Sequence, residues 1–262
     1  METSSPFDLL KTDELVVKII KMAMDSMDGN GKRVPDSAEK HSFLINTVSK
    51  ISKRFRRLAA DKSLWREPIV FRFSRQNQIR SLRSFSDFPV SKLVIHCFSE
   101  YLDGTKIRIL AGKFPSLEQL ILPYIRSWPI LPNPWSSLTN LTFMVESFDS
   151  LKDVKLYMAL PNLKFFRMCS NTFATILPDM TGCEELQVIC LVDLGASGNG
   201  VFELPGASGV PGKIPFPRRM KELHGYDRLN TSISMEEYFE NCSLLQSHGW
   251  ETECKCNPSF SV

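Results

Sequence analysis

The sequence predicts an α/β protein in which a small all-helical N-terminal module, residues 1–68, precedes a short, irregular array of strand-containing repeats, residues 69–262. Two observations indicate this division. Apolar residues recur at helical spacing in two segments before residue 68, and a short apolar pattern returns every 21 to 27 residues from residue 90 onward. A Gly- and Pro-rich stretch at 195–217 is predicted to be a loop inserted into the repeats.

The first helix is predicted near residues 13–23, where apolar side chains recur at helical spacing: Leu15, Val16, Ile19, Ile20 and Ala23. Asp13 and Glu14 stand at its start, where carboxylates interact favourably with the helix dipole. Residues 25–40 are polar and contain Gly29, Gly31 and Pro35, so we expect a flexible loop there.

A second amphipathic helix is predicted from Leu44 to Leu58. Spacings of 4, 3, 4 and 3 residues place its apolar side chains on one face: Leu44, Val48, Ile51, Phe55 and Leu58. The segment from Asp61 to Trp65 closes this unit with an aromatic residue. Because two short helices have little apolar area to bury between themselves, they must pack on the rest of the chain or on a partner.

The N-terminal residues resemble an F-box over positions 8–68. The resemblance lies in Thr12-Asp13-Glu14-Leu15 with Ile19-Ile20, in the segment from Val48 to Ala59 that contains Lys53-Arg54-Phe55, and in Leu64-Trp65. Thr12 stands where the family usually has proline, and the 25–40 loop is longer than the usual connection. The resemblance implies docking on the Skp-family adaptor of cullin-based ubiquitin ligases through a set of apolar residues: Leu15, Ile19, Ile20, Val48, Ile51, Phe55, Leu58, Leu64 and Trp65. A helical cap in front of a repeat array is the alternative.

The pattern apolar-x-x-apolar-x-apolar occurs five times between residues 90 and 191, beginning at Val90, Leu117, Leu138, Leu163 and Leu186. Its period resembles that of leucine-rich repeats, roughly 20–29 residues, and the segments between the starts resemble the F-box proteins that carry such repeats. The resemblance implies a solenoid in which each unit contributes a short strand with alternate residues pointing inward. Segment 103–111 is typical of an outer-side helix. An ordinary α/β domain with several buried strands is the alternative.

If the solenoid forms, the strand residues between the inward positions face its concave side. Those predicted to bind a protein substrate are Lys92, His96, Gln119, Ile121, Asn140, Thr142, Phe165, Arg167 and Val188. Their mixture of apolar and polar side chains suits a protein partner better than a polyanion.

Composition narrows the function classes further. The net charge of +3 is too small for the clustered basic footprint of a nucleic-acid-binding protein. No apolar run approaches the roughly 18 residues of a membrane span, and the seven cysteines have no disulfide framework, so a cytoplasmic or nuclear location is expected.

The sequence contains no metal-site spacing, cofactor motif or catalytic motif. The prediction is therefore a non-catalytic substrate receptor of a Skp–cullin–F-box ubiquitin ligase, without metal or cofactor. An interaction scaffold without a ligase role is the alternative, and an α/β enzyme is the third possibility if the repeat interpretation fails.

Overall fold

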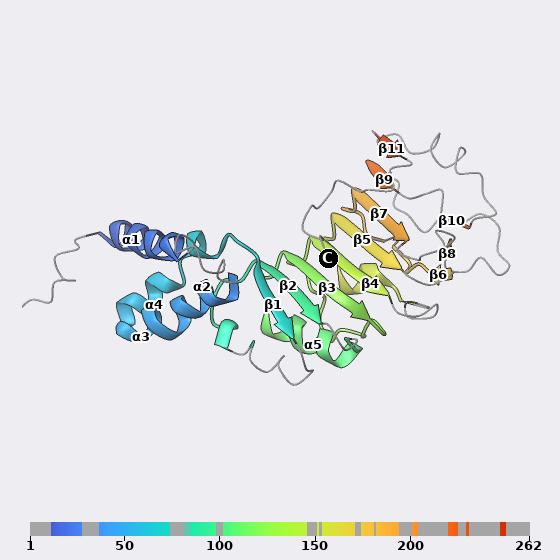
Figure 1. Ribbon diagram of the computed structural model, residues 1–262. Coiled ribbons are helices and arrows are strands. Elements are labelled where there is room, and N and C mark those ends of the chain that lie inside the picture. Colours follow the sequence, from blue (N-terminus) through green and yellow to red (C-terminus); the bar gives the residue numbers. More distant parts are fainter. Residues whose placement is uncertain are drawn as a thin grey trace, which may run out of the picture.

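The computed structural model describes residues 12–27, 37–73, 82, 84–97, 102–145, 151, 154–170, 174–180, 182–193, 201–203, 220–224, 229–230 and 247–249. Its centre is an eight-stranded parallel sheet (Figure 1). In spatial order the strands are β1 (Ile69–Phe73), β2 (Lys92–Cys97), β3 (Gln119–Ile125), β4 (Asn140–Val145), β5 (Phe165–Ser170), β7 (Val188–Asp193), β9 (Glu222–His224) and β11 (Ser247–Gly249). A second, three-stranded parallel sheet has the order β10 (Leu229–Asn230), β8 (Val201–Glu203), β6 (Ala174–Ile176).

Helices gather beyond β1, at one end of the large sheet (Figure 1). They are α1 (Asp13–Ser26), α2 (Ser37–Phe43), the π-helix η2 (Leu44–Val48), α3 (Ser49–Ile51), α4 (Lys53–Ala59) and the 3-10 helix η3 (Lys62–Trp65). Two further helices, α5 (Gly104–Lys113) and α6 (Leu156–Ala159), connect strands of the sheet. None of the helices in the described part of the chain has the length and hydropathy that a membrane crossing needs.

Neighbouring strands of the large sheet are aligned so that the buried apolar residues of one strand pair with those of the next. One fully buried row crosses the sheet on its inner face: Ile69, Leu93, Leu120, Leu141, Phe166, Ile189 and Leu223. A tight turn precedes β3 and another precedes β4. In the first the Leu117 N–H donates to the Phe114 carbonyl at 3.1 Å, and in the second the Leu138 N–H donates to the Trp135 carbonyl at 3.1 Å. The repeating apolar pattern therefore predicted the strands and their buried residues.

The predicted fold, an all-helical module followed by a leucine-rich-repeat solenoid, is wrong. The chain instead has the α/β architecture of the alternative, a parallel eight-stranded sheet flanked by a few short helices. A single hydrophobic cluster extends from Val16 to Leu223 and continues across residue 68, where a domain boundary was predicted. A spacing of apolar residues predicts which strands are neighbours, but it does not determine how the connecting segments pack.

The second predicted helix is also interrupted. Ser52 has an extended backbone, with φ of −163° and ψ of 170°, and it caps α4 by accepting a hydrogen bond from the Phe55 N–H at 3.2 Å. Serine is a preferred residue at the N-terminal cap of a helix. Helix α3 therefore ends at Ile51, and α4 begins at Lys53. Ile51, the last residue of α3, is exposed, whereas Leu44, Val48 and Phe55 are buried.

The two predicted loops are shorter than expected. Residue 25 still belongs to α1 and residues 37–40 belong to α2, so helical structure enters both ends of the 25–40 segment, and residues 28–36 lie outside the described residues. The predicted insertion at 195–217 contains strand β8, and its other residues also lie outside the described part.

Gly182 is expected to tolerate no side chain, because a Cβ atom there would lie 2.6 Å from Cγ of Tyr157. We expect Gly182→Ala to lower the free energy of unfolding by about 1–3 kcal/mol, the usual cost of overpacking. Urea titration checks this, with Gly112→Ala as control, because nothing lies within 4 Å of a Cβ at that position. If the two variants unfold alike, the close approach of Tyr157 is contradicted.

Candidate protein-binding surfaces

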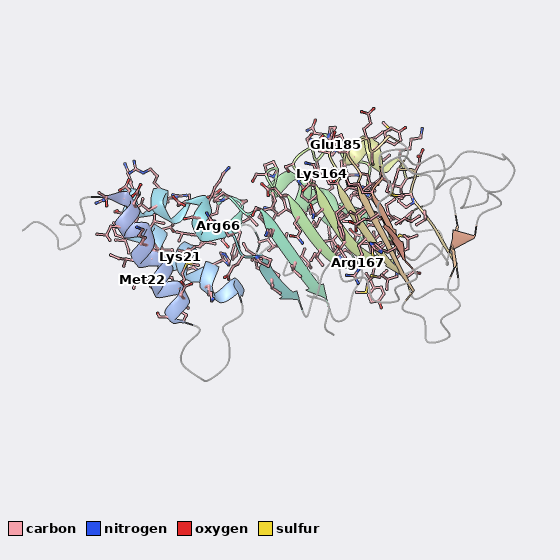
Figure 2. All side chains as sticks on the ribbon, turned by 90° about the horizontal axis from the view of Figure 1, so that it is seen from above. Lys21, Met22, Arg66, Lys164, Arg167 and Glu185 are labelled. Carbon is pink, nitrogen blue, oxygen red and sulfur yellow. The ribbon has the colours of Figure 1, made fainter. Side chains whose placement is uncertain are left out.

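Helix α1 has one buried and one exposed apolar face. Val16, Ile20 and Met24 pack into the core. Leu15, Ile19 and Met22 follow at the i, i+4 and i+7 spacing of a second stripe and are 45%, 44% and 70% exposed. Met22 can be followed on α1 in Figure 2. We call these three residues the α1 stripe. A stripe of large apolar side chains open to water is typical of a surface that binds another protein.

Asp13 holds the N-terminal turn of α1 against α4. The Arg54 Nε donates a hydrogen bond to Oδ1 of Asp13 at 3.0 Å, and Nη2 of Arg57 donates to Oδ2 at 2.7 Å. These partly exposed ion pairs are individually weak. They link the first turn of α1 to α4, while the buried face of Val16, Ile20 and Met24 packs α1 against the core and leaves the α1 stripe exposed.

The predicted adaptor-binding residues separate into two groups. Leu15, Ile19 and Ile51 are exposed, Ile51 to 52%. The other six are buried in the protein's own core: Ile20, Val48, Phe55, Leu58, Leu64 and Trp65. Trp65 also donates a hydrogen bond from Nε1 to the Ala59 carbonyl at 2.7 Å. A partner could touch this second group only if the core opened.

Met22 is the residue of the α1 stripe that was not predicted as a site residue from the sequence. Its signal was present, because it continues the Leu15–Ile19 spacing by one further turn. The predicted helix ended its apolar pattern at Ala23 and assigned all apolar residues to one face, so the second stripe was not separated from the first.

The outer face of the sheet carries the residues predicted to bind a substrate. One row runs along the sheet with direct pairing between neighbouring strands and half-buried side chains: Lys92, Gln119, Asn140, Phe165 and Val188. A second row lies deeper, since Ile121, Thr142 and Arg167 are buried. The backbone of His96 pairs with Arg72 in β1, but its side chain lies outside the described part.

The two rows extend to residues that were not predicted as site residues. Beyond Val188 and Cys190, strand β9 adds Glu222 and His224, whose carboxylate and Nε2 are 3.2 Å apart. The degraded repeat at Met220–Leu223 was the available signal for this strand. Figure 2 shows Arg167 away from Lys164 and Glu185, which lie near the ends at which β5 and β7 begin.

Three cavities lined by described residues have volumes of about 210, 240 and 630 Å³. The largest lies where η3 meets the ends of β2, β3 and β4, and neither histidine nor cysteine lines it. The described residues of its lining offer ionic and hydroxyl groups to a ligand.

Comparison with known proteins assigns no family to the chain. No protein-family model matches the sequence, and none of the curated proteins matches it significantly. The candidate protein-binding surfaces in the described part of the chain are the α1 stripe and the outer face of the sheet.

Proposed function

We propose that this chain is a non-catalytic binding subunit that docks on a Skp-family adaptor through α1 and presents a bound protein to a cullin-based ubiquitin ligase. The observation that carries the proposal is the α1 stripe, which lies within the segment that resembles an F-box. On this proposal the chain supplies proximity, because it holds the substrate near a ubiquitin-loaded enzyme that other subunits provide.

The chemistry of the α1 stripe supports a protein partner. Burying an exposed leucine, isoleucine or methionine side chain contributes about 1.5–3 kcal/mol, so three neighbouring side chains can anchor an interface. Lys18 and Lys21 are exposed on the same helix, and Lys50 and Lys53 flank the exposed Ile51. These lysines favour an adaptor surface that carries acidic groups around an apolar centre.

The outer sheet face supports the second half of the proposal. Its half-buried row offers Phe165 and Val188 for apolar contact, and Gln119 and Asn140 for hydrogen bonds. Such a mixture is typical of protein interfaces, which combine an apolar centre with directional polar groups. We therefore assign the substrate to this face and the adaptor to α1.

One observation favours the alternative, an interaction scaffold without a ligase role. Six of the residues through which the F-box resemblance implies adaptor contact are buried in the protein's own core. The scaffold would use the same two surfaces, but for partners other than the adaptor. Adaptor binding alone separates the two functions.

The deciding experiment measures binding of the full chain to a Skp-family adaptor. Ile19→Glu/Met22→Glu is expected to weaken binding at least about tenfold, since charged groups replace two anchors at the interface. Ile109→Glu/Met158→Glu is the matched control, because these residues lie on α5 and α6 with comparable exposed fractions of 42% and 63%.

The control pair is expected to bind within about twofold of the wild type, as substitutions outside an interface normally do. Should the wild type fail to bind under conditions in which other F-box proteins bind, the ligase function is lost and the scaffold is favoured. Equal weakening by both double variants would place the adaptor elsewhere on the chain.

A further inference from the structure

The largest of these three cavities lies between the helices and the sheet. It has a volume of about 630 Å³, and η3 with the residue that follows it contributes Lys62 and Arg66 to its lining. Segments leading into β2, β3 and β4 contribute the opposite wall. Figure 2 shows Arg66 at this junction. We call this cavity the junction groove.

Two cations stand on one wall of the junction groove. Lys62 and Arg66 are both exposed, and no ion pair within the described part of the chain involves either of them. Arg66 also contributes, after the two hydrogen bonds from Ser63, to lowering the pKa of Asp61. Their positive charge is therefore available to a ligand.

The opposite wall presents hydrogen-bond acceptors. The Ser137 hydroxyl lies 2.8 Å from the Leu117 carbonyl and 2.6 Å from the Pro115 carbonyl, and the Thr139 hydroxyl lies 3.1 Å from the Glu118 carbonyl. Because these hydroxyl protons are directed at neighbouring carbonyls, the hydroxyl oxygens can still accept hydrogen bonds. The exposed Glu118 carboxylate adds a charged acceptor on this wall.

We propose that the junction groove binds an acidic peptide segment of a partner protein. Its carboxylates pair with Lys62 and Arg66, and Arg66 can hold one in the bidentate geometry that guanidinium groups favour. Its backbone N–H groups face the acceptor wall. A nucleic acid suits the groove less well, since none of the described residues that line it is aromatic, and bases in single strands are usually bound by stacking on aromatic side chains. This site is separate from the α1 stripe and does not depend on adaptor binding.

The test uses the full chain and a fluorescein-labelled peptide of alternating glutamate and serine residues, followed by fluorescence anisotropy at low salt. Lys62→Glu/Arg66→Glu is expected to weaken binding at least about tenfold, through lost attraction and new repulsion. Arg108→Glu/Lys155→Glu is the matched control: it replaces one exposed arginine and one exposed lysine outside the groove. It should change the affinity less than about threefold, because neither residue lines the junction groove.

Several outcomes would overturn the proposal. Failure of the wild type to bind the peptide is one. Equal weakening by both double variants is another, because it would indicate general charge attraction rather than binding in the groove. Tighter binding of an oligothymidine of the same charge would assign the groove to nucleic acid. All four substituted residues are exposed, so the variants should melt at the wild-type temperature, which circular dichroism verifies.

Discussion

Replacing Trp65 with alanine is expected to lower the free energy of unfolding by about 3–5 kcal/mol, among the largest losses that a single core substitution causes. The Trp65 ring lies between two others, with centroid distances of 4.9 Å to His41 and 5.0 Å to Phe88. Its Nε1 also donates to the Ala59 carbonyl at the end of α4. One side chain thus connects α2, α4 and the approach to β2.

Chemical denaturation measures this loss, with far-ultraviolet circular dichroism as the signal because it reports the backbone and not the substituted tryptophan. Trp65→Phe keeps an aromatic ring but removes the hydrogen bond to the Ala59 carbonyl. We expect it to lower the free energy of unfolding by an intermediate amount, because leaving a buried carbonyl without its donor costs about 1–3 kcal/mol. Met22→Ala, on the exposed stripe, should stay within about 0.5 kcal/mol of the wild type. A loss at Trp65 no larger than that of Met22→Ala would contradict the burial of this ring.

The Cys183 thiol is expected to react with iodoacetamide on the order of a thousandfold more slowly in the folded chain than in the unfolded chain near pH 8, because only the thiolate is nucleophilic. Burial, and then the negative charge of Asp179, raises the pKa of Cys183 from 9.0 to about 12. Mass spectrometry of the peptide that contains Cys183 measures the rate, with protein in concentrated guanidinium chloride as reference. Equal rates in the two states would contradict this environment.

The same shift affects stability in alkaline solution. The folded pKa of Cys183 lies above its unfolded value, so folding favours the neutral thiol. This contribution is fully present below the unfolded pKa of 9.0 and is lost as pH rises toward the folded pKa of about 12. The loss is about 1.4 kcal/mol per pH unit within that window. Cys183→Ala should lack this component of the pH dependence.

Local patterns predicted much of the secondary structure. The amphipathic spacing around Leu15 and Ile19 predicted α1, and Asp103 predicted the start of α5, where its side chain accepts a hydrogen bond from the Lys106 N–H. The recurring apolar triplets predicted β2, β3, β4, β5 and β7 together with their buried rows. These features depend on the period of helices and strands, which a sequence displays directly.

The candidate sites were predicted less completely. The alternation of side chains along the strands predicted that Gln119, Asn140 and Phe165 share one face, and these residues do pair across neighbouring strands. It did not reveal that Ile121, Thr142 and Arg167 in the adjacent row would be buried. Burial depends on what packs over each position, and neighbours distant in sequence decide that.

The sequence by itself predicted α1, α5 and the five strands with the repeated apolar pattern, and it showed which side chains are apolar enough to need burial. Only the tertiary structure decided that eight of the strands join one parallel sheet and that α1 keeps Ile19 and Met22 outside the core. The physical reason is that an apolar side chain gains the same free energy against its own core or against a partner. Which of the two it meets depends on the three-dimensional packing of the whole chain.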